Sequence, residues 1–156
     1  KKLSLQNLDG IVLAYAGVKR MGFQNFVSGL IPFDIMVPPS GQGAIGIETT
    51  NEKDCLEFLK PLNHENTFRE VMIERELQSM IGGGCQAPLG INASISGSTL
   101  TLHVFLGDET GGVIIKEMYT ENIWNKDDLM WQIVSKIYKK TKVPPAKAEG
   151  TFKRLN

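Results

Sequence analysis

The sequence predicts a mixed α/β fold, in which a partial α/β segment precedes a small α+β unit. Two observations indicate it. Residues 11–16 and 44–48 are short, continuous apolar runs next to glycines, which is typical of strands covered on both faces. From residue 67 onward a helical period, an alternating period and a second helical period follow one another. That order predicts a helix, a small three-stranded antiparallel sheet and a second helix, with the helices on one face of the sheet.

The first segment is predicted to contain two buried strands and a helix. Residues 11–16 form the first strand, and Val18 begins a short helical turn before a loop rich in glycine and proline. Residues 44–48 form the second strand, whose glycines permit close backbone approach. Asn51 is placed to cap a helix through Leu59, and Pro61 marks its end.

The α+β unit is predicted to open with a long helix. Thr67 and Glu70 have the spacing of a capping box, and Gly82 ends the pattern. Apolar residues recur between them at helical intervals, at Phe68, Val71, Met72, Leu77, Met80 and Ile81.

Three strands and a final helix are predicted to follow. Residues 91–95 and 100–105 alternate around Ser96-Gly97-Ser98, which predicts a hairpin. Residues 108–112 form a second turn before a strand over residues 113–119. The last helix runs over residues 126–139, with Leu129, Trp131, Ile133 and Ile137 among its apolar residues.

Composition narrows the class of protein. The chain is 42% hydrophobic and 22% charged, as in soluble globular proteins, and 17 basic residues balance 17 acidic ones. We therefore expect no nucleic-acid partner and, since no apolar run approaches the roughly 20 residues of a membrane span, no membrane partner. Two cysteines are too few for a disulfide framework, and no secretory signal opens the sequence, so a cytoplasmic location is expected. Because the chain begins at Lys1 and enters an apolar run almost at once, we expect it to be a fragment.

Cys85 lies in the glycine-rich stretch GGGCQAPLG, immediately after the predicted long helix. Taken alone, this pattern favours a helix end with a small, packed cysteine. Three consecutive glycines nevertheless exceed what a cap needs and clear space beside the sulfur. A thiolate is the best side-chain nucleophile for a permanent carbon–sulfur bond, so covalent attachment is the functional alternative.

The other candidates are each weak alone. Gly41-Gln42-Gly43 reads as a plain turn, or as an amide and backbone N–H groups offered to a polar ligand. Arg20 reads as part of a solvated helix face, or as a bidentate fork for a carboxylate at the end of a strand. Cys55 reads as core filling. The cysteines and histidines lack the spacing of a zinc site, so no metal is expected.

In combination, four segments resemble the C-terminal half of the porphobilinogen deaminase (hydroxymethylbilane synthase) family. They are LAYAGVKRMG at 13–22, PSGQGAIGIE at 39–48, LNHENT at 62–67 with Glu74-Arg75, and GGCQAPLG at 83–90. The resemblance implies a transferase that joins four porphobilinogen units into hydroxymethylbilane for haem and related tetrapyrroles, with release of ammonia. It implies a dipyrromethane primer held by a thioether to the residue matching Cys85.

The resemblance also implies roles and domains for this chain. Gly83, Gly84, Gln42 and Gly43 would lie against the cofactor, and Arg20 would hold a substrate carboxylate. Residues 1–37 would end a second α/β domain of periplasmic-binding-protein-like fold, 38–62 would cross back to the first domain, and 63–156 would form the third. The family's catalytic aspartate matches no acid here, so no catalytic residue is assignable and the fragment is expected to be inactive. The full-length enzyme is expected to be a monomer.

Two departures and two alternatives accompany this interpretation. Thr49-Thr50 stands where the family usually has a basic residue, and Gly82 stands where a charged or polar one is common. One alternative is a non-enzymatic α+β module that binds RNA or a regulatory ligand, with a basic patch of Lys136, Lys139, Lys140 and Lys142. The other is a cysteine-dependent hydrolase, in which His64 or His103 meets Cys85.

Overall fold

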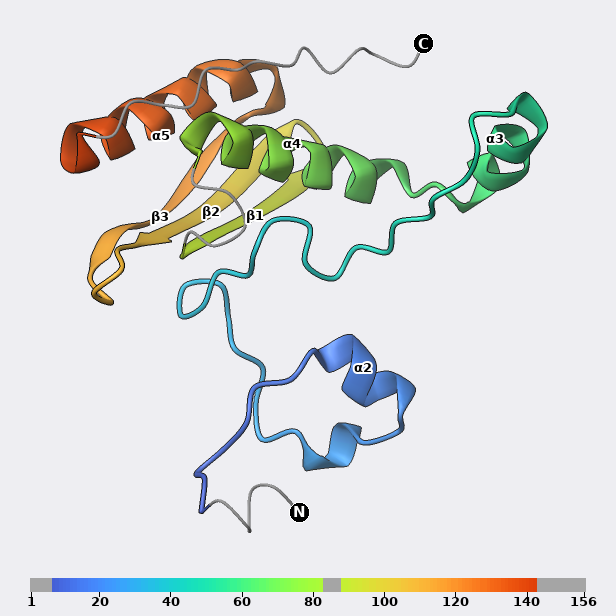
Figure 1. Ribbon diagram of the computed structural model, residues 1–156, viewed down its shortest axis with the longest axis horizontal. Helices are drawn as coiled ribbons and strands as arrows, with labels where there is room; N and C mark the ends of the chain where they lie inside the picture. Colours follow the sequence, from blue (N-terminus) through green and yellow to red (C-terminus); the bar gives the residue numbers. More distant parts are fainter. Residues whose placement is uncertain (1–6, 83–87, 143–156) are drawn as a thin grey trace. The chain divides into compact units, whose positions relative to one another are not determined.

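The computed structural model describes residues 7–82 and 88–142, and the chain divides into two compact units between Ile31 and Pro32. The first unit contains the short helix α2 (Tyr15–Arg20) and the 3₁₀ turn η1 (Gln24–Phe26). The second contains α3 (Lys53–Leu59), the 3₁₀ turn η2 (Lys60–Leu62) and the whole sheet (Figure 1).

The α+β unit matches the predicted order of elements. Helix α4 (Glu65–Ile81) leads to strands β1 (Leu89–Ser96), β2 (Thr99–Gly107) and β3 (Val113–Asn122), which pair antiparallel in the order β1-β2-β3. The 3₁₀ turn η4 (Ile123–Asn125) then joins β3 to α5 (Lys126–Thr141). Both long helices cover the same face of the sheet (Figure 1), as predicted.

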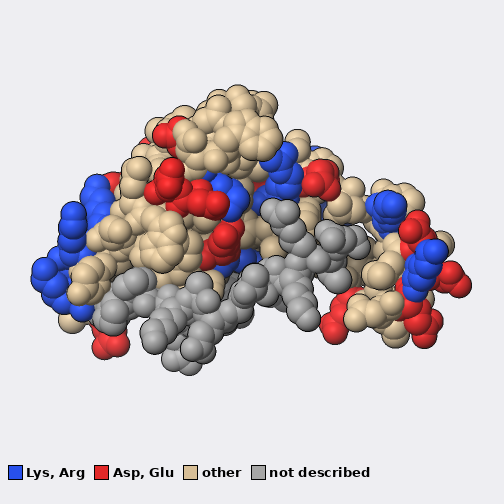
Figure 2. Space-filling model, turned by 90° about the horizontal axis from the view of Figure 1, so that it is seen from above, with Lys and Arg blue, Asp and Glu red and all other residues tan. Residues whose placement is uncertain are grey.

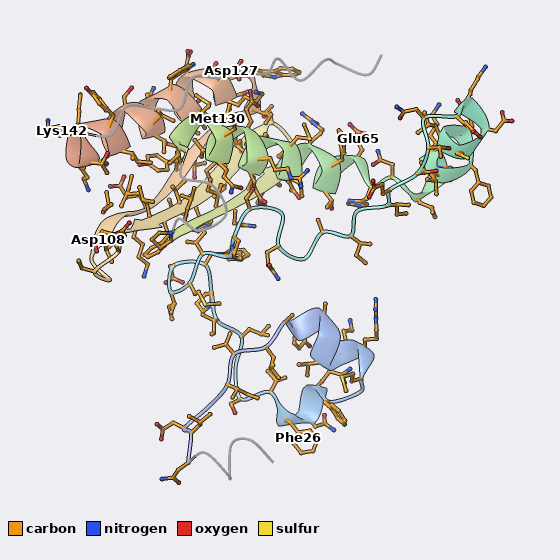
Figure 3. The ribbon with its side chains drawn as sticks, in the orientation of Figure 1. Phe26, Glu65, Asp108, Asp127, Met130 and Lys142 are labelled. Atoms are coloured by element: carbon orange, nitrogen blue, oxygen red, sulfur yellow. The ribbon has the colours of Figure 1, made fainter. Side chains whose placement is uncertain are left out.

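The core lies between this sheet face and the two helices. Alternate residues of β2 point into it, since side chains of a strand alternate between faces. On α5, Met130 (labelled in Figure 3) is buried, whereas Trp131 is 52% exposed. The buried hydrophobic residues are Ile73, Leu77, Met80, Ile91, Ala93, Leu100, Leu102, Val104, Leu106, Ile115, Ile123, Leu129, Met130, Ile133, Val134 and Ile137.

Both predicted turns of the sheet form. Ser96 pairs with Thr99, so Gly97 and Ser98 close the first hairpin. The second hairpin is closed by Asp108, whose Oδ1 accepts the backbone N–H groups of Thr110 and Gly112 at 2.9 and 2.8 Å. The hydrogen bond from the Thr110 hydroxyl, and after it the one from the Gly112 N–H, hold the pKa of the Asp108 carboxyl below its ordinary value.

Strand β1 is an edge strand, and three of its backbone N–H groups donate away from β2. The Ile91 N–H donates to the Pro38 carbonyl at 3.0 Å. The Ala93 and Ile95 N–H groups donate, each at 2.8 Å, to Oε1 of Glu74 and of Glu70 on α4. Helix α4 is therefore fastened to β1 by two carboxylates one helical turn apart.

Two predicted helix starts are wrong. Helix α3 begins after Glu52 rather than Asn51, and no side chain caps it. Helix α4 begins at Glu65, with the His64 Nδ1 accepting the Thr67 N–H at 3.3 Å. Because the helix begins two residues before Thr67, Thr67 lies inside it and forms no capping box, and the Glu70 carboxylate accepts from β1. The predicted end of α4 at Gly82 is confirmed.

The two predicted buried strands are also wrong. Residues 11–14 are irregular, and Tyr15 and Ala16 already belong to α2. Residues 44–48 are irregular, with Ile45 83% exposed. An apolar run forms a buried strand only where neighbouring strands satisfy its backbone and other layers cover its faces. Among the residues the structure describes, the three strands of the sheet pair with one another and leave these runs without partners.

Candidate functional site

The structure describes three of the six predicted site residues. Arg20 is the last residue of α2 in the first unit, and its side chain is exposed. Gln42 and Gly43 lie in the second unit, in a loop between Pro39 and Ala44. Cys85, Gly83 and Gly84 lie outside the described residues, so their predicted roles stay predictions.

Gln42 lies at the centre of two overlapping turns. The Gln42 N–H donates to the Pro39 carbonyl at 3.1 Å, and the Ala44 N–H donates to the Gly41 carbonyl at 3.2 Å. Gly41 and Gly43 have φ values of +73° and +89°, which side-chain-bearing residues rarely adopt. The glycines therefore permit a tight double turn that leaves Gln42 exposed.

This turn, residues 39–44, is docked on the α+β unit by the chain that precedes it. The Pro38 carbonyl accepts from Ile91 of β1, as described above. Gly90 passes so close to this chain that a Cβ there would collide with the Val37 carbonyl oxygen. At the turn itself, the Gly41 N–H donates to Glu74 Oε2 at 2.6 Å. The sheet edge and α4 together fix where the turn lies.

Glu74 holds the turn, and sequence reasoning did not assign it a role. Glu74 is 5% exposed. In addition to the Gly41 N–H, its carboxylate accepts the Ala93 N–H and, at 3.4 Å, the Asn92 Nδ2. Burial raises the pKa of the Glu74 carboxyl, and these hydrogen bonds oppose that rise only in part. The sequence did contain a signal for a buried acid: Glu74 lies three residues before Leu77 and seven before Ile81, on the apolar stripe of the helix.

Ser40 adds an unpaired polar atom beside the turn. Its Oγ is buried and has no hydrogen-bond partner among the residues described. Buried hydroxyl groups are normally paired, so an unpaired one next to Gly41 suits a polar ligand. With the exposed Gln42 amide, the turn offers several polar groups to a polar ligand.

The structure also describes the two histidines and Cys55, which the sequence offered as further candidates. His64 caps α4, and the His103 ring lies against Phe33, with centroids 5.4 Å apart. Cys55 is half-buried rather than core filling, in an open pocket of about 430 Å³ that Phe58 also lines. The helix that carries it has no buried residue, which corrects that prediction.

Within the part of the chain that the structure describes, the basic patch is partly engaged in internal contacts. Lys136 pairs with Glu117 at 2.6 Å, and Lys140 donates to the Ile114 carbonyl at 2.8 Å, so two lysines of the supposed basic patch are engaged within the unit. Figure 2 shows basic groups lying together at one end of this face and interspersed with acidic groups elsewhere. Within residues 7–82 and 88–142, no three His, Cys, Asp or Glu side chains gather as a metal site, and no helix has the length and apolarity to span a bilayer.

The fold thus defines a mixed α/β protein whose open antiparallel sheet holds a glycine turn at one edge. Comparison with protein families specifies it further. The family model "Porphobilinogen deaminase, dipyromethane cofactor binding domain" matches residues 1–57, and "Porphobilinogen deaminase, C-terminal domain" matches residues 68–140. Together these successive models match most of the chain, and the chain belongs to the porphobilinogen deaminase family.

Curated relatives agree with this assignment. The porphobilinogen deaminase of Campylobacter hominis is 39% identical over 119 residues, and that of Campylobacter jejuni strain 81-176 is 41% identical over 119 residues. Each match covers 75% of this chain and 39% of the relative. The chain therefore spans well under half the length of these relatives. The resemblance seen in the sequence is confirmed.

Proposed function

We propose that this chain is the C-terminal part of a porphobilinogen deaminase, a transferase that condenses four porphobilinogen units into hydroxymethylbilane with release of ammonia. The observation that carries the proposal is the ordered match of two successive domain models of this one family. The first model is described as a cofactor-binding domain, which supports a dipyrromethane primer as the group held.

Within this function, Cys85 is the proposed covalent anchor of the primer. A thioether is stable, so it would retain the growing chain through every condensation. Gly83 and Gly84 would clear space beside the sulfur, while Gln42 and Gly43 would contact the pyrroles. The docked turn and the unpaired Ser40 Oγ support this placement of a polar ligand. Arg20 would bind a carboxylate of the substrate through its bidentate fork.

The proposed division of labour follows the family plan. Residues 1–37 would end a periplasmic-binding-protein-like α/β domain, 38–62 would cross to the other α/β domain, and 63–156 would form the cofactor-bearing domain. No acid of this chain matches the family's catalytic aspartate, so we expect the 156 residues alone to be inactive. The complete enzyme would act as a cytoplasmic monomer.

The test is mass spectrometry and activity of the full-length enzyme that carries these residues. We expect a two-pyrrole adduct on Cys85, and loss of both adduct and activity in Cys85→Ser. Cys55→Ser is the matched control, and it should retain both. An enzyme without the adduct, or undiminished activity of Cys85→Ser, would contradict the proposal.

A further inference from the structure

Glu74 is the residue on which three parts of the α+β unit converge. It belongs to α4, it accepts a hydrogen bond from the β1 backbone at Ala93, and it accepts another from the turn at Gly41. The bond from Gly41, at 2.6 Å, is shorter than those from Ala93, at 2.8 Å, and Asn92, at 3.4 Å. Gly41 is followed in the chain by Gln42, so this bond fixes the backbone directly beside the exposed side-chain amide of Gln42.

A buried carboxylate is an unusual choice for a purely structural tie. Placing a charge away from water is costly, and an apolar residue of similar volume often serves stability as well or better. Here two backbone N–H groups and the Asn92 amide compensate the charge. The cost is acceptable if the position of the turn itself matters to function.

Glu70 provides an internal comparison, one helical turn earlier on the same face of α4. Its Oε1 accepts the Ile95 N–H of β1 at 2.8 Å, which repeats the Glu74 to Ala93 bond. Glu70 makes no hydrogen bond to the turn among the contacts of the described residues, whereas Glu74 makes one. Fastening the helix to the sheet and fixing the turn are therefore separable.

We propose that Glu74 is a positioning residue of the active site: by holding the Gly41 N–H it sets where Gln42 and Gly43 meet the pyrroles. The proposal rests on the proposed function. It assigns Glu74 no contact with substrate or cofactor, and its effect passes through the turn.

The test compares Glu74→Gln with Glu70→Gln in the full-length enzyme. Both changes remove one carboxylate that fastens α4 to β1. Glu70 accepts one backbone N–H, which the glutamine oxygen can still accept, whereas glutamine at position 74 has one acceptor oxygen for the two donors Gly41 and Ala93, so the hold on the turn is weakened. Loss of one charge-assisted hydrogen bond from a positioned group should raise the KM for porphobilinogen about tenfold. We expect that rise in Glu74→Gln with kcat changed less, and a KM within about twofold of wild type in Glu70→Gln.

The readouts separate the two proposals. A wild-type enzyme without adduct on Cys85 and without activity contradicts the proposed function. An active wild type in which both variants raise KM equally, or in which Glu74→Gln leaves it unchanged, overturns the positioning role alone. Should Glu74→Gln not fold, Glu74→Asp replaces it, because the shortened side chain keeps the charge but withdraws from Gly41; the same rise in KM is then required.

Discussion

Residues 65–142 and residues 7–62 contain comparable apolar runs, yet only the former bury them. Ile114-Ile115 on β3 and Ile11-Val12-Leu13 are similar in composition, but Ile115 is 1% exposed and Leu13 is 63% exposed. The difference lies in the partners. The strands of the sheet have each other and two amphipathic helices, whereas residues 11–14 and 44–48 have no neighbouring strand among the described residues. An apolar run is buried only where neighbouring strands and helices are available to pack against it.

The largest expected contrast is in backbone hydrogen exchange. Amides of β2 should exchange only through global opening of the α+β unit, whereas those of residues 11–13 need no such opening. For a domain of ordinary stability, protection should differ by at least about 10³-fold. Exchange measured by mass spectrometry or NMR on the 156-residue chain checks this. Comparable protection of the two segments would break the comparison.

Core truncation should show the same contrast in stability. Leu77 is fully buried on α4, so Leu77→Ala should lower the free energy of unfolding by about 2–5 kcal/mol through lost burial and the cavity left behind. Leu13→Ala is the matched change on an exposed leucine and should cost less than about 0.5 kcal/mol. Denaturant unfolding of both variants measures the difference. Equal losses would mean that Leu13 is packed in solution.

Glu74 should give a smaller effect that depends on pH. Its pKa is raised by burial above the ordinary value of 4.5, so the folded state binds the proton more tightly than the unfolded state. Its contribution to stability is then fully present below pH 4.5 and is lost as pH rises through the raised pKa. The free energy of unfolding of wild type, relative to Glu74→Gln, should therefore fall over that range. A difference that rises instead would contradict the assigned direction.

Glu117 should give the smallest effect, with the opposite sign. Its pKa is lowered by the hydrogen bond from Lys136 and, secondarily, by that from Tyr119. The stabilisation is present above the ordinary pKa and is lost as pH falls through the lowered one. Because the Glu117 and Lys136 side chains are 31% and 45% exposed, Glu117→Gln should cost no more than about 1 kcal/mol at neutral pH. Thermal unfolding at neutral and acidic pH checks this, with Glu109→Gln as an exposed control.

The α+β unit was predictable from sequence because its determinants are local. Alternation fixed the strands, Ser96-Gly97-Ser98 and residues 108–112 fixed the turns, and Gly82 fixed the end of α4. The prediction of strands over residues 11–16 and 44–48 is wrong because an apolar run alone does not show whether another strand will pair with it. The predicted capping box is wrong because the helix begins earlier, after the cap His64, and Glu70 accepts a hydrogen bond from β1 that local spacing does not show.

The candidate site was predictable only in part. Gln42 and Gly43 stand out through their glycine context and the family resemblance, and the structure places them in one docked turn. Glu74 acts through residues 33 positions earlier and 19 positions later in the chain, a juxtaposition that only folding creates. The roles assigned to the six predicted site residues stay predictions; these residues are Arg20, Gln42, Gly43, Gly83, Gly84 and Cys85.

The two carboxylates that fasten α4 to β1 also affect whether a strand of another molecule can pair with this edge strand. An edge strand with free N–H groups is a template on which a strand of another molecule can add. At Ile91, Ala93 and Ile95 those donors are already taken by Pro38, Glu74 and Glu70. At these three positions β1 therefore offers no free N–H group to an added strand, and Glu74, which also accepts from Gly41 of the turn, occupies one of them.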